Sequence, residues 1–459
     1  MTELHELDVS TCGTLLRRRA LSSVELTRHA LERIAGLDSM YHAFITVTAE
    51  RALEDAARAD GELKSGMDRG PLHGIPYALK DVIETKDIRT TCASRLLINN
   101  IPAQDAAAAG RMRQAGGALL GKLMTYEFAT AGPSYDLAFP PAVNPRAPNR
   151  ITGGSSSGCA AAVAAGFARV AVGTDGGGSA RSPASYCGIA GLKPTYGRVS
   201  TDGLLPLSPS LDHVGPMAAS VEEAAHCLDA LSNPSAPRAR DDLDKGVKGL
   251  RIGYARAWTE GADAAVTMAL ESAITLLKEL GAHVEDATLP DYSMFEAACI
   301  VIMQAEAFAL HKDDLRNNGH LYGAKAFQNL VTGAILGPSD LSDALKVKAL
   351  LTAEIDMTFS RYDALLVVNT HTPALPISEF TSDRPRWTEM RTLPFNVSGH
   401  PALAVPMGID AMGLPLGLQF AGSRMAEGMI CRIGKAFEEA LGLRLRFPAM
   451  PASQGRRFG

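Results

Sequence analysis

The chain has 459 residues, of which 46% are apolar and 21% are charged, and its formal net charge at pH 7 is −5. This composition is typical of a globular protein with a large buried core, and the acidic balance predicts no nucleic-acid partner. Seven scattered cysteines without a C-x-x-C pair argue against a disulfide framework or a zinc site and favour a reducing compartment. Because the first twenty residues hold no apolar signal segment and the most apolar tract, 160–173, is too short to span a membrane, we expect a cytoplasmic protein without a membrane span.

The first third of the chain alternates predicted helices and strands. A capping box between Ser22 and Glu25 marks the start of the first helix. A buried strand ends at Lys80, where an open α/β sheet commonly places functional side chains. The predicted elements are helices over 22–38, 50–63 and 106–115, strands over 75–79 and 118–121, and a proline-rich loop over 132–150.

Two glycine-rich loops lie between residues 152 and 195. The first, TGGSSSG, leads into an alanine-rich helix, and the second, GTDGGGS, follows a short apolar strand and ends at Ser179. Glycine loops let main-chain N–H groups converge on one point, which suits either a phosphate or the oxyanion of an acyl-transfer intermediate. Neither the Gly-Lys-Ser/Thr exit of a P-loop nor a G-x-G-x-x-G pattern is present, so acyl transfer is favoured.

Three side chains supply the parts of a lysine-activated serine nucleophile: Lys80, Ser155 and Ser179. A lysine acts as a base only when it is neutral, and burial lowers its pKa toward that state. The apolar run over 75–79 predicts such a buried setting for Lys80.

These segments resemble the amidase signature family. The resemblance rests on motifs that continue in the same order along most of the chain, namely GIPYALKD, GGSSSG, GTDGGGSAR, CGIAGLKPT, SLDHVGP, GHPALAVP and LPLGLQ. It implies an α/β fold whose central mixed, largely parallel twisted sheet is covered by helices on both faces.

The resemblance also implies residue roles. Ser179 matches the nucleophile, Lys80 the base, and Ser155 the middle serine, which in the family follows a cis peptide bond. The main-chain N–H groups expected to form the oxyanion hole are those of Gly176, Gly177, Gly178 and Ser179. Three neighbours, Ser156, Asp175 and Arg181, are expected to support the site. Asp175 is expected to be an orienting hydrogen-bond acceptor. Arg181 is expected to be structural, with binding of a substrate carboxylate as the alternative.

The substrate pocket is less well defined by the sequence. The small residues Gly176 and Ala180 suggest a roomy site, which would suit aryl amides or carbamates. Tyr135 and Phe139 are hypothesised to line the pocket, against the alternative that they only anchor their loop. Five further residues are candidates for the substrate channel: Met303, Phe308, Tyr322, Phe327 and Leu330. For each of them, a place in the ordinary helical core is the more usual explanation.

The rest of the chain predicts a continued α/β core. His213, in a loop over 204–216, is expected to position that loop. Strand, helix and strand over 250–254, 266–280 and 283–285 predict a parallel β-α-β unit. The remaining predicted elements are helices over 221–231 and 425–441, helical structure over 294–361, and strands over 364–368, 403–405 and 416–420. We predict an N-terminal helical cover (1–70), a catalytic core (71–231), an exposed connection (232–248) and a second part of the same sheet (249–459).

The resemblance implies a hydrolase acting on the carbon–nitrogen bond of a small non-peptide amide through a serine acyl-enzyme, and the same machinery accepts aryl amides, esters and carbamates. No metal or organic cofactor is implied. Two other functions stay open: the amidase subunit of a glutamyl-tRNA(Gln)-type amidotransferase, and a non-catalytic anion-binding protein. The sequence gives neither the oligomeric state nor the need for a partner subunit.

Overall fold

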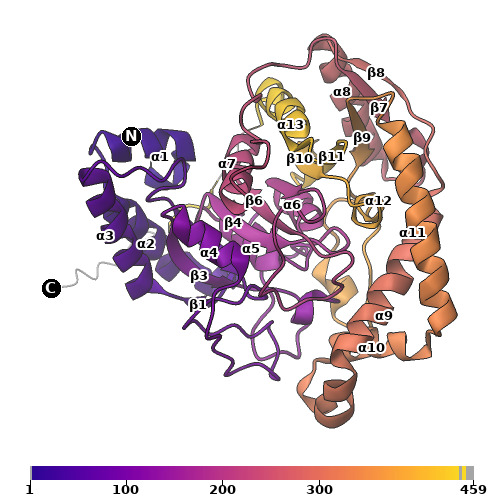
Figure 1. Ribbon diagram of the computed structural model, residues 1–459, viewed down its shortest axis with the longest axis horizontal. Helices are drawn as coiled ribbons and strands as arrows, with labels where there is room; N and C mark the ends of the chain where they lie inside the picture. Colours follow the sequence, from indigo (N-terminus) through magenta and orange to yellow (C-terminus); the bar gives the residue numbers. More distant parts are fainter. Residues whose placement is uncertain (1–2, 444–446, 451–459) are drawn as a thin grey trace.

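The computed structural model describes residues 3–443 and 447–450. These residues form one β-sheet that runs through the molecule (Figure 1). Its eleven strands follow the order β1-β3-β2-β4-β6-β5-β10-β11-β9-β7-β8. The strands are β1 (Phe44–Val47), β2 (Pro76–Lys80), β3 (Ala118–Leu123), β4 (Val170–Thr174), β5 (Ala190–Lys193), β6 (Val214–Ala218), β7 (Arg251–Tyr254), β8 (His283–Asp286), β9 (Ala364–Val368), β10 (Ala402–Ile409) and β11 (Pro415–Ala421).

The sheet is mixed, as predicted, but it is less parallel than expected. Six of the ten pairings between described strands are antiparallel and four are parallel. The antiparallel pairings join β1 to β3, β4 to β6, β6 to β5, β5 to β10, β10 to β11 and β11 to β9. The predicted β-α-β unit is confirmed, because β7 and β8 pair in parallel.

Helices cover both faces of the sheet, which confirms the predicted α/β class. Figure 1 shows α1, α2 and α3 together at one end of the molecule and α9, α10 and α11 at the other. The α-helices are α1 (Val9–Arg17), α2 (Ser23–Tyr41), α3 (Ala49–Lys64), α4 (Ala107–Gln114), α5 (Ser157–Ala164), α6 (Arg181–Cys187), α7 (Val221–Leu231), α8 (Ala264–Glu279), α9 (Tyr292–Asn318), α10 (Ala324–Val331), α11 (Pro338–Thr358), α12 (Leu393–Val397) and α13 (Glu427–Leu441).

Local sequence signals explain why several of these elements form. The capping box at the start of α2 is present, since the Ser22 hydroxyl accepts from the Glu25 N–H at 3.1 Å and Glu25 accepts from the Ser22 N–H at 2.8 Å. The apolar stripe of α8 faces the core, and Gly281 follows the helix with a φ of +91° that favours glycine.

The predicted division of the chain at residues 232–248 stays a prediction. The structure describes this range in full and forms no helix or strand within it, but Ala239, Leu243 and Val247 are buried. The segment therefore lies on the surface and is anchored to the core by three apolar side chains.

One helix among the described residues, Tyr292–Leu321, is long and apolar enough to cross a membrane by length and composition. About two fifths of its most apolar stretch is buried (39%). Its N-terminal part, α9, packs against α10, α11 and α12, so core packing accounts for part of its apolar surface.

Candidate active site

The first glycine loop brings Ser155 to Lys80. The loop precedes α5 and contains a cis peptide bond between Gly154 and Ser155, as the resemblance implied. Lys80 ends β2, and its Nζ donates to Ser155 Oγ at 2.7 Å and to Thr174 Oγ1, at the end of β4, also at 2.7 Å. All three side chains are buried. Thr174 was missed in the sequence, although it lies within the GTDGGGS motif.

Burial changes the acid–base behaviour of this lysine. Removal of the ammonium from water lowers the pKa of Lys80 to about 8, while the neighbouring acidic groups, Cys159, Asp212 and Asp175 in that order, raise it and offset only part of the effect. A substantial neutral fraction of Lys80 therefore exists near pH 8, which agrees with the predicted buried, neutral base.

The second glycine loop places Ser179 beside the first. The Ser156 N–H donates to the Ser179 carbonyl at 3.1 Å, and the Ser156 hydroxyl donates to the Thr174 carbonyl at 3.0 Å. Ser156 thus joins the two loops, and its supporting role in the reaction stays a prediction. The Ser179 side chain is partly exposed and faces a cavity.

The oxyanion-hole prediction needs one correction. The Gly178 N–H donates to Asp175 Oδ1 at 2.8 Å, so this donor is already used within the loop. Gly177 and Ser179 both line the cavity. The candidate donors at the cavity are therefore the N–H groups of Gly177 and Ser179, and the contribution of Gly176, which does not line the cavity, stays a prediction.

Asp175 and Arg181 form a buried ion pair behind the loop. Arg181 Nη2 lies 2.9 Å from Asp175 Oδ1, and Asn396 Nδ2 donates to the same oxygen at 2.9 Å. Burial, the largest single effect, would raise the pKa of Asp175, but the charge and hydrogen bond of Arg181, the charge of Lys193 and the hydrogen bond from Asn396 together outweigh it and hold the pKa well below its usual range. Arg181 also donates to the Thr392 carbonyl at 3.0 Å and does not line the cavity, which fits a structural role.

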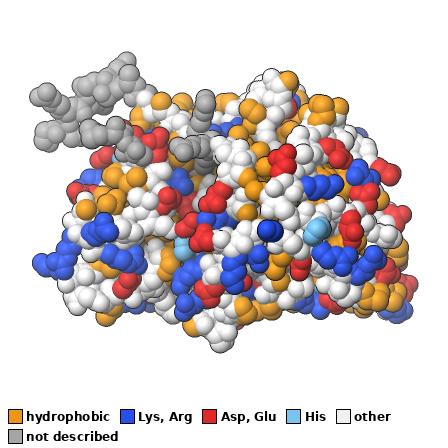
Figure 2. All heavy atoms as spheres, turned by 90° about the horizontal axis from the view of Figure 1, so that it is seen from above, with side chains coloured by type: hydrophobic (Ala, Val, Ile, Leu, Met, Phe, Trp, Pro, Cys, Tyr) orange, Lys and Arg blue, Asp and Glu red, His pale blue; other side chains and the backbone are white. Residues whose placement is uncertain are grey.

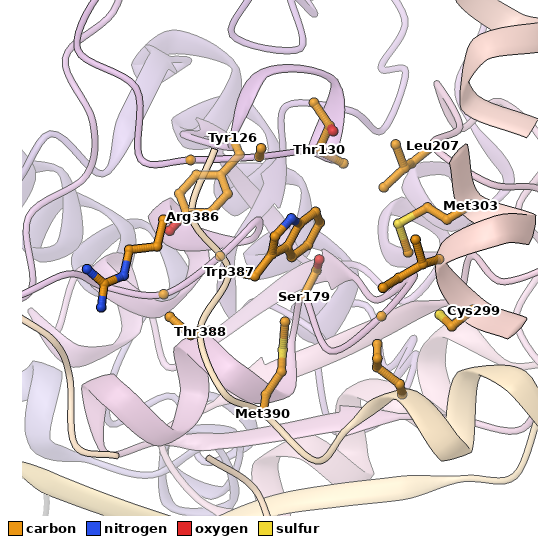
Figure 3. A pocket seen from close by; sticks show the side chains of 18 of the residues that line it. Tyr126, Thr130, Ser179, Leu207, Cys299, Met303, Arg386, Trp387, Thr388 and Met390 are labelled. Carbon is orange, nitrogen blue, oxygen red and sulfur yellow. The ribbon is translucent and has the colours of Figure 1, made fainter. Parts of the chain in front are cut away.

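A cavity of about 240 Å³ opens above Ser179. Figure 3 shows the Trp387 indole beside Ser179, with Met390 on another side and Cys299 and Met303 extending from α9. The residues that line the cavity are Tyr126, Ala129, Thr130, Ala131, Gly132, Gly153, Gly154, Gly177, Ser179, Leu207, Glu296, Cys299, Ile300, Met303, Gln304, Phe380, Arg386, Trp387, Thr388, Glu389, Met390, Arg391 and Leu393.

For most of the pocket-wall candidates the structure favours the alternative given with each of them, a loop anchor or helical core. Tyr135 is 48% exposed, with Lys325 Nζ 5.8 Å from its ring centre, and Phe139 packs under Arg89, with 5.7 Å between the guanidinium carbon and the ring centre. Neither residue lines the cavity, because the side chains of their loop turn to other neighbours. Of the candidate channel residues only Met303 lines it, while Phe308, Tyr322, Phe327 and Leu330 do not.

The expectation of a roomy site at Gly176 and Ala180 was also wrong. Ala180 is buried, and neither residue lines the cavity. A Cβ on Gly176 would lie 2.6 Å from Asp212 Oδ1, so this glycine makes room for a carboxylate.

His213, predicted to position its own loop, joins that loop to the second glycine loop. Its backbone pairs with Asp175 in both directions, at 2.8 and 3.1 Å, and its Nδ1 lies 2.7 Å from the Leu211 carbonyl. Its Nε2 lies 3.2 Å from Lys193 Nζ, and burial holds the pKa of both groups well below their usual values. The histidine therefore holds the loop after Leu211 in place.

Comparison with known proteins decides the family. The family model described as Amidase matches residues 25–431. The chain belongs to the amidase signature family. Membership supports an enzyme that acts on carbon–nitrogen bonds, and it speaks against the non-catalytic anion-binding alternative.

Individual relatives cover nearly the whole chain. A glutamyl-tRNA(Gln) amidotransferase subunit of Geobacter metallireducens is 39% identical over 475 residues, which cover 95% of this chain and 98% of the relative. The peptide amidase of Stenotrophomonas maltophilia superposes with a TM-score of 0.86 at 32% identity, covering 97% of this chain and 99% of that one. The corresponding amidotransferase subunit of Thermotoga maritima gives a TM-score of 0.82 at 31% identity, covering 98% and 99%.

These relatives contradict the expectation that partners are limited to a small-molecule substrate. The name of the Geobacter and Thermotoga proteins refers both to a subunit of a larger enzyme and to a tRNA. The expectation failed because a net charge of −5 is a sum over the whole chain, whereas contacts are made by local surfaces. Figure 2 shows basic and acidic side chains interspersed over one face of the molecule.

Proposed function

We propose that this amidase hydrolyses an amide through a covalent intermediate on Ser179. The observation that carries the proposal is the 2.7 Å contact between Lys80 Nζ and Ser155 Oγ, made in a buried site directly beside the loop that presents Ser179 to the cavity. A buried base, a relaying hydroxyl and an accessible serine are the parts that nucleophilic acyl transfer requires.

The proposed reaction has two stages. Neutral Lys80 accepts a proton from Ser155 as Ser155 takes the proton of Ser179, whose oxygen attacks the amide carbonyl. The N–H groups of Gly177 and Ser179, together with that of Gly176, stabilise the oxyanion. The proton returns through Ser155 to the leaving nitrogen, and water then hydrolyses the acyl-enzyme.

We further propose that the chain is the amidase component of an amidotransferase of the glutamyl-tRNA(Gln) type. Similarity to the Geobacter protein over 95% of this chain and 98% of the relative supports this setting. The cavity wall carries Glu296 and Glu389 as well as Arg386 and Arg391. Opposite charges at one cavity suit a zwitterionic amide donor such as glutamine, whose ammonium and carboxylate need separate partners. A cytoplasmic location suits a tRNA-linked reaction.

A second candidate is a free-standing amidase for apolar amides. Tyr126, Met303, Trp387 and Met390 give the cavity an aromatic and thioether wall, which favours an apolar acyl or aryl group. Esters and carbamates would react at the same serine, since each presents a carbonyl with a leaving group.

Intact-mass spectrometry after incubation with a fluorophosphonate tests the nucleophile. We expect one adduct on the wild type and on Ser182→Ala, and none on Ser179→Ala; Ser182 is a buried serine on α6 and serves as the matched control. An adduct that persists in Ser179→Ala would overturn the proposed mechanism.

The two settings are separated by substrate and by assembly. Ammonia release from glutamine, together with partner proteins that co-purify with a tagged chain from its own cells, would support the amidotransferase setting. Hydrolysis of aryl amides by the isolated chain, without glutaminase activity or partners, would support the free-standing amidase.

A further inference from the structure

The peptide unit between Gly177 and Gly178 is held from both sides. Its carbonyl accepts a hydrogen bond from Thr392 Oγ1 at 2.6 Å, and its N–H donates to Asp175 Oδ1 at 2.8 Å. Both partners are buried, and Asp175 is itself fixed by Arg181. A peptide plane with both polar ends bound cannot turn without breaking one of these bonds.

The glycine at position 178 is required by this arrangement. Its φ is +127°, and a Cβ there would lie 2.2 Å from Thr392 Oγ1 and 3.0 Å from Met390 Sδ. Thr392 therefore occupies the space that a side chain at position 178 would need, and the loop and the threonine fit directly against each other.

Thr392 ends the segment that forms one wall of the cavity. This segment, residues 386–392, is called the strap, and all of its residues except Thr392 line the cavity. Figure 3 shows Trp387 and Met390 of the strap around Ser179. The strap is fixed near Thr392, because the Tyr292 hydroxyl donates to the Met390 carbonyl at 2.6 Å and Arg181 donates to the Thr392 carbonyl at 3.0 Å.

We propose that Thr392 is a positioning residue for the oxyanion hole. Its hydroxyl sets the plane of the Gly177–Gly178 peptide, and that plane determines where the N–H groups of Gly177 and Ser179 point on either side of it. Thr392 also joins the oxyanion loop to the strap, so contacts between substrate and strap are transmitted to the loop. The inference rests on the proposed function, in which Ser179 is the nucleophile.

The kinetic test removes the hydroxyl without changing the shape of the side chain. Using p-nitrophenyl acetate, we expect Thr392→Val to lower kcat by about 10-fold to 100-fold, since misplaced oxyanion donors weaken transition-state binding, with KM changed by less than about twofold. Thr392→Ser keeps the hydroxyl and should recover most of kcat. The matched control is Thr85→Val, because Thr85 is a buried threonine that donates to a main-chain carbonyl, that of Ile83 at 3.1 Å, outside the site.

Hydrogen exchange gives a readout that does not depend on activity. We expect amides in the segment 174–182 to exchange faster in Thr392→Val than in the wild type, and to be unchanged in Thr85→Val. Unchanged exchange in this segment, or a loss of kcat that Thr392→Ser does not recover, would overturn the proposal. If the wild type forms no fluorophosphonate adduct, the proposed function fails, and hydrogen exchange still decides whether Thr392 positions the loop.

Discussion

Gly176 and Asp212 lie against each other, and a Cβ on the glycine would be 2.6 Å from Asp212 Oδ1. The carboxylate has little freedom to move away, because its Oδ2 accepts the N–H groups of Leu207 and Ser208 at 2.8 and 2.9 Å. The buried carboxylate of Asp212 therefore explains why position 176 of the oxyanion loop holds a glycine. The size of the substrate is not needed to explain it.

Substitution of Gly176 should harm small and bulky substrates equally. We expect Gly176→Ile to lower kcat/KM by about fivefold to 150-fold for both p-nitrophenyl acetate and p-nitrophenyl octanoate, because displacing Asp212 or the loop costs about 1–3 kcal/mol. Gly61→Ile on α3, where a Cβ would meet open space, is the control. A loss confined to the octanoate would restore the interpretation of Gly176 as part of a roomy acyl pocket.

The rate of serine modification should depend on the protonation of Lys80. Burial lowers the pKa of this lysine to about 8, and the base must be neutral to accept a proton. The second-order rate constant for inactivation by a fluorophosphonate should therefore fall about tenfold per pH unit below pH 7 and level off above pH 9. A rate that is constant down to pH 5 would exclude Lys80 as the neutral base.

Thr174 gives a test of how Lys80 is held. Its hydroxyl accepts a hydrogen bond from Nζ at 2.7 Å, and such an acceptor favours the charged lysine. Thr174→Val should shift the acid limb of the inactivation profile to lower pH, because the lysine loses an acceptor that favours its charged form. The maximal rate should fall, because a lysine with a lower pKa is a weaker proton acceptor. Thr152→Val is the control, because the Thr152 hydroxyl donates to the Gly153 carbonyl and leaves Lys80 untouched. An unshifted limb would show that Thr174 does not contribute to the pKa of Lys80.

Local signals in the sequence were sufficient to predict those helices and strands whose formation depends on residues adjacent in the sequence. The capping box at Ser22, the apolar stripe of α8 and the buried run before Lys80 each predicted an element that the structure contains. The strands β5 and β6 were missed because their sequences, AGLK and VGPMA, contain glycine and proline, which are disfavoured in strands.

The pocket wall could not be derived in the same way. Tyr126, Met303 and Trp387 come from three distant segments, and which side chains meet at Ser179 depends on how the whole chain packs. Tyr135 and Phe139 were chosen because they are aromatic and lie in a loop whose counterpart in the amidase signature family borders the acyl pocket. In the structure Phe139 packs with the core cluster around α5, and Tyr135 lies on the surface beside Lys325.

A buried carboxyl next to the cavity should make stability depend on pH. Glu127 accepts from the Ser94 hydroxyl at 2.6 Å and from the Gly323 N–H at 2.8 Å, and burial raises its pKa to about 7 from 4.5. Between pH 4.5 and pH 7 the folded protein holds a proton on Glu127 that the unfolded chain has released. The contribution of protonated Glu127 to the free energy of unfolding is therefore complete below pH 4.5 and is lost as the pH rises through 7. The loss amounts to about 3 kcal/mol.

Replacement of Glu127 by glutamine removes this titration. We expect the Tm of Glu127→Gln, relative to the wild type, to be higher at pH 8 than at pH 5. The exposed Glu54→Gln on α3 should show no such difference. Equal effects of Glu127→Gln at both pH values would mean that the carboxyl is already ionised at pH 5.

Arg181 offers a decision between a structural role and substrate binding. It is fully buried, pairs with Asp175 at 2.9 Å and does not line the cavity. Arg181→Met leaves the Asp175 carboxylate buried without its charged partner, which should lower the free energy of unfolding by about 3–5 kcal/mol.

The double variant Asp175→Asn/Arg181→Met should recover part of this stability, since it removes the unpaired charge; thermal unfolding measures both effects. If Arg181 instead bound a substrate carboxylate, Arg181→Met would keep its Tm and raise KM for glutamine while leaving KM for an uncharged ester unchanged. Because the guanidinium is bonded to Asp175, Asn396, Gln419 and the Thr392 carbonyl, we expect the loss of stability and no selective change in KM.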